Sequence, residues 1–247
     1  MFANRSNAAI SRAPGMSADR KAAVWIGVLY IIGTVVLALS VPLTGATLTA
    51  AGGPSQVAAP PNQLAIGALL VLLAGFALAM IPVVFWPIGR RYSETLAMGY
   101  VMFRGGIETV LYIFIALGWL LLIALGTEPD AAPLAGLVNT VEAVIGQQLS
   151  AIPFALGALM FSFLLYQSRL VPRWLSVWGL VGAVLYMVPP IGNMFGHSLG
   201  VLMVPTAAQE MVMAIWLIAK GFNQTAIAAA SVGGAPRRQP AVSGTAA

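Results

Sequence analysis

Residues 64–91, LAIGALLVLLAGFALAMIPVVFWPIGRR, decide the fold of this chain. The stretch has no charged side chain before Arg90, and it lacks the alternation of apolar and polar residues that marks a half-buried strand. About 20 apolar residues in a helix are enough to cross the hydrocarbon core of a bilayer. Because backbone groups in lipid must be hydrogen-bonded within the protein, the stretch predicts a membrane-spanning α-helix.

Further apolar runs lie on both sides of this one. They occupy residues 24–46, 93–125, 140–166, 174–188 and 199–219, and we expect the run from Trp174 to be interrupted by Pro189-Pro190, with a turn over residues 192–198. The chain is 60% hydrophobic and only 8% charged, whereas soluble domains carry about 25% charged residues. We predict an all-α polytopic transmembrane bundle of six helices over residues 20–222, with disordered tails at 1–19 and 223–247.

The basic residues indicate how the bundle is oriented. Eleven of the twelve Lys and Arg side chains precede the first helix, lie between helices 2 and 3 or 4 and 5, or follow helix 6. Lys and Arg accumulate in the cytoplasmic loops of membrane proteins. This pattern predicts that both termini are cytoplasmic, and it explains the net charge of +5 without a nucleic-acid partner.

The composition excludes several kinds of chemistry. The chain has no cysteine and a single histidine, His197, whereas zinc sites are built from several Cys or His ligands. Catalytic motifs such as GxSxG, HExxH and GxxxxGK[ST] are also missing. We therefore expect no metal, no cofactor and no enzyme activity.

Four segments resemble a bacterial family of integral membrane proteins, domain-of-unknown-function family 4386. They are RKAAVWIGVLY at 20–30, LAMGYVMFRGGIETV at 96–110, LLYQSRLVPRWLSVWGLVG at 164–182 and QEMVMAIWLIAKGF at 209–222. The resemblance covers about residues 20–222 and implies a multi-helix membrane protein without an established activity. It places a buried Arg-then-Glu element on Arg104 and Glu108, and a last-helix Glu on Glu210.

A stripe of polar side chains lies within the predicted third helix. Tyr100, Arg104, Glu108 and Tyr112 follow one another at intervals of four residues, so they share one helix face. Arg104 and Glu210 each lie ten residues from the cytoplasmic end of their helices, a depth of roughly 15 Å. We predict that they meet. The full candidate cluster is Arg104, Glu108, Glu210, Gln209, Tyr100, Tyr112, Gln147 and Gln148.

Two interpretations of this cluster stay open. Charges within a bilayer are costly, so a paired Arg–Glu set is a common structural clamp between helices. Alternatively, one guanidinium facing two carboxylates leaves a carboxylate uncompensated, which is the arrangement expected of a proton-handling site.

The corresponding functions are a non-catalytic membrane module acting through lipids or partner proteins, and a proton-linked carrier of small molecules or ions. An intramembrane enzyme is the third hypothesis and the weakest. In each case we expect a multi-pass protein of the bacterial cytoplasmic membrane, with the lipid bilayer as its surroundings.

Overall fold

The computed structural model describes residues 16–49, 60–126, 130 and 132–233. Within them are six helices that are long and apolar enough to cross a membrane, which confirms the predicted all-α bundle. The predicted tail at 1–19 lies mostly outside the described residues, as does the end of the chain from residue 234.

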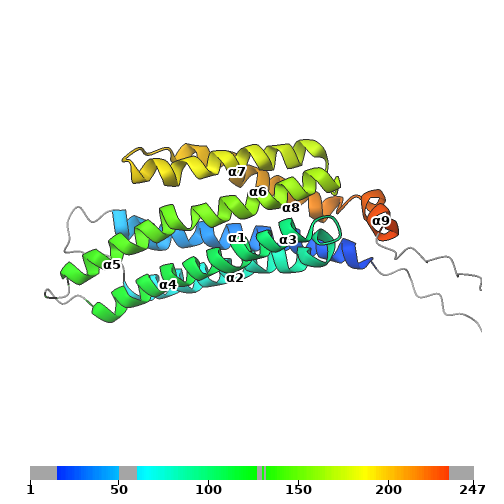
Figure 1. Ribbon diagram of the computed structural model, residues 1–247. Coiled ribbons are helices and arrows are strands. Elements are labelled where there is room, and N and C mark those ends of the chain that lie inside the picture. Colours follow the sequence, from blue (N-terminus) through cyan, green and yellow to red (C-terminus); the bar gives the residue numbers. More distant parts are fainter. Residues whose placement is uncertain (1–15, 50–59, 127–129, 131, 234–247) are drawn as a thin grey trace, which may run out of the picture.

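The helical segments follow one another along the chain. They are α1 (Ala18–Thr49), α2 (Pro61–Gly89), α3 (Glu94–Tyr100), η1 (Val101–Ile107), α4 (Glu108–Leu125), α5 (Ala132–Val144), η3 (Ile145–Leu149), α6 (Ala151–Ser168), α7 (Arg173–Met194), η4 (Gly200–Met203), α8 (Val204–Ala219) and α9 (Gln224–Gly233). The spanning helices run side by side along one axis (Figure 1). Helix α1 packs against α2 and α8, α2 packs against α4, and α6 packs against α7.

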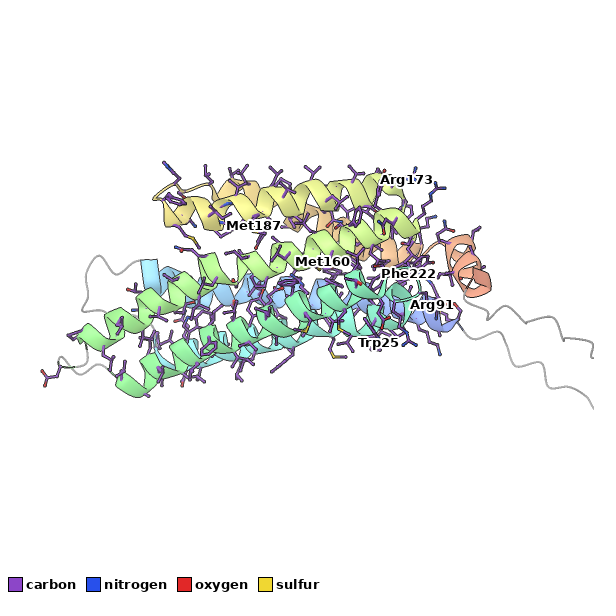
Figure 2. The ribbon with its side chains drawn as sticks, viewed as in Figure 1. Trp25, Arg91, Met160, Arg173, Met187 and Phe222 are labelled. Atoms are coloured by element: carbon purple, nitrogen blue, oxygen red, sulfur yellow. The ribbon has the colours of Figure 1, made fainter. Side chains whose placement is uncertain are left out.

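Four basic segments converge at one end of this bundle. The guanidinium of Arg20 at the start of α1 donates hydrogen bonds to the carbonyls of Leu217 and Ile218 near the end of α8. Arg91, in the α2–α3 loop, pairs with Asp19 at 3.5 Å. Figure 2 places Arg91 and Arg173, the latter at the start of α7, at this same end. Basic residues from separate parts of the chain therefore lie at one end of the bundle.

The structure contains two π-helical segments that the sequence does not predict, one within the spanning helix Glu94–Leu125 and one just before the spanning helix Ala151–Ser168. Segment η1 joins α3 to α4, and segment η3 joins α5 to α6. A π-helical turn carries an extra residue per hydrogen-bonded ring, and such turns are frequent at functional sites. Gly105 and Gly106 lie in η1 and Gly146 lies in η3, so small residues accompany the wider turn in both places.

Helix α7 corrects one sequence prediction. It continues through Pro189 and Pro190 to Met194, whereas we expected the helix to be interrupted at the prolines. Both prolines are buried in the bundle. Proline is tolerated in spanning helices because neighbouring helices and small local adjustments satisfy the backbone groups that it frees.

Helix α9 falls within the segment for which the sequence predicts a tail without structure. The chain before it is held in place because the backbone N–H of Asn223 donates to the carbonyl of Leu170 at 2.8 Å. Ile227, on α9, is 7% exposed and belongs to the same apolar core as Phe222. Ile227 thus anchors a helix in which four of the ten residues are alanine.

An aromatic core fills the basic half of the bundle. The ring of Phe85 packs edge-on against Phe161, with 4.9 Å between centroids, and Tyr100 stacks on Phe161 at 4.6 Å. By contrast, large apolar side chains on the outer faces, such as Leu69 and Ile215, are more than 60% exposed. That outward-facing apolar surface is the one expected to contact lipid.

Candidate functional site

Arg104 lies at the centre of a buried ion-paired cluster. Its Nη1 donates to the two carboxylate oxygens of Glu108 at 3.2 and 3.3 Å, and its Nη2 donates to Oε1 of Glu210 at 3.2 Å. The side chains of Arg104 and Glu108 are 3% and 1% exposed, and that of Glu210 is 14% exposed. One guanidinium therefore joins the third spanning helix to α8, as the matched depths of Arg104 and Glu210 predict.

Local packing fixes the guanidinium in this position. It lies over the ring of Phe154 on α6, 4.4 Å from the centroid, a geometry that attracts a cation to the aromatic face. Gly157, one turn further along α6, makes the close approach possible, because a Cβ at that position would lie 3.2 Å from Cβ of Arg104. The hydroxyl of Tyr112 donates to Oε1 of Glu108 at 3.0 Å.

Tyr100 shares the face of the stripe but bonds elsewhere. It is 1% exposed, and its hydroxyl lies 3.2 Å from the hydroxyl of Tyr30 on α1. The predicted stripe thus contributes three directly linked residues, Arg104, Glu108 and Tyr112, together with a tyrosine that ties the third spanning helix to the first.

Of the three predicted glutamines, Gln209 and Gln148 form no hydrogen bond with the ion-paired side chains within the described structure. Gln209 is 6% exposed and donates to the carbonyl of Leu175 on α7 at 3.4 Å, so it links two helices instead. Gln148 lies in η3 and is half-buried. The backbone of Gln147 belongs to η3, and its side chain lies outside the described part of the structure.

A cavity of about 150 Å³ adjoins the cluster. It is lined by Thr34, Leu37, Leu78, Arg104, Glu108, Tyr112, Ser150, Ala151, Phe154, Tyr186, Ala207 and Glu210. Nε of Arg104 is buried and has no hydrogen-bond partner among the described residues. The cavity therefore brings polar groups of the ion-paired cluster together with aromatic and aliphatic side chains.

The charges of the cluster do not balance. Arg104 contributes +1, and Glu108 and Glu210 contribute −1 each, so the fully ionised set has a formal charge of −1. A net charge surrounded by low dielectric is costly, so the second carboxylate favours a bound proton or a cation. Within the described residues, no group of three or more His, Cys, Asp or Glu side chains is placed to hold a metal ion.

Sequence reasoning missed the aromatic partners of the cluster. Tyr30, Phe154 and Tyr186 come from α1, α6 and α7, and each lies in an apolar run where an aromatic residue is unexceptional. Their sequence signal was the hydroxyl group of Tyr30 and Tyr186. A buried tyrosine hydroxyl usually has a hydrogen-bond partner, so a tyrosine in an apolar run points to a polar group nearby.

The six apolar helices define a multi-span helical membrane protein. Residues 25–221 match the model of the family described as Domain of unknown function (DUF4386), and the chain belongs to this family. The match lies within residues 20–222, the span over which the sequence resembles family 4386. No curated protein and no solved structure matches the chain.

Proposed function

We propose that this protein is a non-catalytic module of the bacterial cytoplasmic membrane, and that its Arg104 cluster is a clamp that holds the bundle together. The observation that carries the proposal is the pairing of one buried guanidinium with carboxylates on two spanning helices, each at 3.2 Å. Arg104 and Glu210 are 106 residues apart along the chain. The clamp therefore fastens segments that no local interaction could bring together.

The orientation that we propose has both termini in the cytoplasm. Its support is the convergence of Arg20, Arg91 and Arg173 at one end of the bundle, because Lys and Arg favour the cytoplasmic side. Glu94, at the start of α3, lies at the same end. It does not oppose the proposal, because acidic residues contribute little to orientation.

Thiol labelling tests whether the cluster is a dry clamp. The chain has no cysteine, so single cysteines are introduced at the cavity residues Thr34 and Ser150, with the exposed Gln167 near the basic end as the positive control. A membrane-impermeant maleimide, applied to each side of sealed vesicles, should label only the control. Labelling of either cavity cysteine would contradict the dry clamp.

A proton-linked carrier is the second candidate, and two observations favour it. The cavity beside the cluster is large enough for a few water molecules, and the uncompensated carboxylate favours a proton or cation. For this function, Glu210→Gln should abolish proton-coupled flux in vesicles while the protein stays folded. Tyr166→Phe, a change outside the cavity, is the matched control, and unchanged flux in the Glu210 variant would exclude the carrier.

A further inference from the structure

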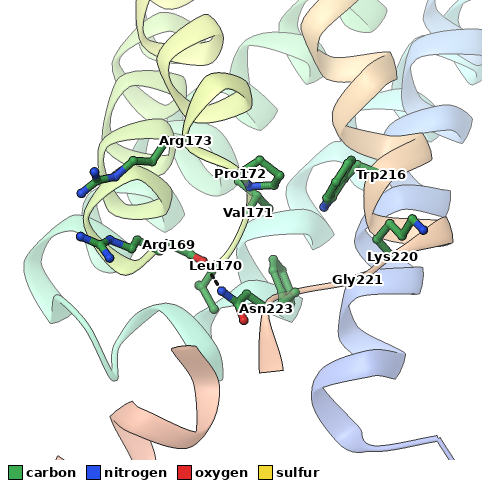
Figure 3. Close-up of a pocket in the computed structure, with 10 residues that line it drawn as sticks. Arg169, Leu170, Val171, Pro172, Arg173, Trp216, Lys220, Gly221 and Asn223 are labelled. Carbon is green, nitrogen blue, oxygen red and sulfur yellow. Dashed lines mark hydrogen bonds between the residues drawn. The ribbon is translucent and has the colours of Figure 1, made fainter. Parts of the chain in front are cut away.

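A second cavity, of about 400 Å³, opens at the basic end between the α6–α7 loop and the end of α8. Figure 3 shows Pro172 and Val171 on one side of it and Trp216 on the other. Lys220 and Gly221 complete the wall formed by the end of α8. This cavity is separate from the Arg104 cluster, with which it shares no lining residue.

The loop that borders this cavity is held firmly in place. Leu170 is fully buried and Val171 is 3% exposed, and both pack in the aromatic core with Phe222. Arg169 caps α6 in the left-handed conformation, with φ of 55°, and its carbonyl accepts a hydrogen bond from Nδ2 of Asn223 at 3.3 Å. The basic side chains of this loop are therefore mounted on a fixed backbone.

Two basic side chains at this cavity, Arg169 and Arg173, lack a counter-charge among the described residues. In Figure 3 the side chains of Arg169 and Arg173, which both line this cavity, point the same way, turned away from Trp216. Neither forms an ion pair with a carboxylate within the described residues, whereas Arg91 at the same end pairs with Asp19. A bound phosphate would supply the missing counter-charge, because arginine forms strong charge-assisted hydrogen bonds to phosphate oxygens.

The surface next to the arginine pair is suited to an acyl chain. Arg173 is the first residue of α7, and Val177, Val181 and Val184 follow on the same side of the helix at 44%, 54% and 56% exposure. Trp174, which is 53% exposed, lies close to Trp216, with 6.3 Å between ring centroids. Tryptophan is enriched at the level of the lipid headgroups. Arg173 thus begins a lipid-facing apolar stripe at that level.

We infer that Arg169 and Arg173 bind the phosphate of an anionic phospholipid, whose acyl chain lies along the exposed stripe of α7. Basic pockets between helices on the cytoplasmic side are suited to such headgroups, and the N-terminal end of the α7 dipole also favours an anion. The inference names a lipid partner for the non-catalytic module proposed above, and it rests on that proposal only for the orientation of the bundle.

The test uses the full-length protein in neutral detergent, titrated with phosphatidylglycerol or phosphatidylcholine while thermal unfolding is followed. Arg169→Gln/Arg173→Gln is compared with Lys21→Gln/Arg90→Gln, which removes the same charge from exposed side chains at the same end. We expect phosphatidylglycerol to stabilise the wild type more than phosphatidylcholine does. Each cation near a headgroup contributes about five-fold to affinity, so the arginine double variant should need about 25-fold more phosphatidylglycerol, and the control should be shifted much less.

Three outcomes would overturn the inference. They are an equal response to the two lipids, equal shifts in the two double variants, and full stabilisation by glycerol phosphate, which would indicate a site for free anions. If the arginine double variant does not fold, Arg173→Gln alone and a salt titration of the wild type take its place, and a salt-independent effect of phosphatidylglycerol would then exclude the site. None of these results bears on the clamp, which is tested at Arg104 without added lipid.

Discussion

Replacing Arg104 with glutamine is the most direct test of the buried clamp. The change removes both ion pairs and leaves the carboxylates of Glu108 and Glu210 without their cation, in surroundings where Glu108 is only 1% exposed. Removing one partner of a buried ion pair costs about 3–5 kcal/mol, because the remaining charge is left uncompensated. For a chain of this size, such a loss lowers the melting temperature by roughly 10 °C.

The control is a variant that neutralises all three charges at once, Arg104→Gln/Glu108→Gln/Glu210→Gln. Replacing a complete buried ion-pair set with neutral groups of similar volume is often tolerated. We therefore expect the triple variant to recover most of the stability that the single variant loses. Both are measured by tryptophan fluorescence during heating in the same neutral detergent.

A melting temperature that does not change in Arg104→Gln would refute the clamp. A triple variant as unstable as the single one would refute charge compensation as the cause of the stabilisation. It would mean that Arg104 acts through packing, such as its contact with the ring of Phe154 at 4.4 Å, and that charge compensation is not the cause.

Three further substitutions test the surroundings of the cluster and the end of α8. Gly157→Val should lower stability by about 1–3 kcal/mol, because its Cβ would lie 3.3 Å from the backbone N of Arg104. Tyr112→Phe removes the 3.0 Å hydrogen bond to Glu108 and should cost about 1.5–3 kcal/mol. Gly221→Ala should cost about 1–3 kcal/mol, since φ of 73° at that position disfavours any side chain. Thermal unfolding in detergent measures all three.

Gly136→Ala is the matched control for the two glycine variants, because a Cβ added there meets no atom within 4 Å. It should leave the melting temperature unchanged or raise it slightly, since alanine favours a helix over glycine. If Gly157→Val and Gly136→Ala behaved alike, the close approach of α6 to Arg104 would have no energetic importance.

The spanning helices and the ion pairs were predictable because long apolar runs and the few charged residues within them can be identified directly in the sequence. A run such as residues 64–89 has only one stable form in lipid, and Lys and Arg mark one side of the membrane. Arg104 and Glu210 stand out in the same way, because charged residues are rare in such runs. Counting residues from the basic helix ends was enough to bring them to the same depth.

The π-helical segments and the path of α7 were not predictable on the same grounds. A fixed spacing of four residues assumes an unbroken α-helix, whereas η1 changes the register at Arg104 itself. The pairing with Glu108 nevertheless forms, because the long guanidinium side chain can adjust its reach. Pro189 and Pro190 end a helix in water but not here, since the surrounding helices decide whether the freed backbone groups are satisfied.

The charge imbalance of the cluster provides a way to separate the two proposed functions. If the cluster is only a clamp, the neutral triple variant loses nothing essential, because glutamine side chains can still form hydrogen bonds between the third spanning helix and α8. If the cluster handles protons, the same variant stays folded but cannot exchange one, because no carboxylate remains in the cavity. A stable triple variant that has lost proton-coupled flux in vesicles would therefore favour the carrier. A stable triple variant in which flux is the same as in the wild type would leave the clamp as the only role of these charges.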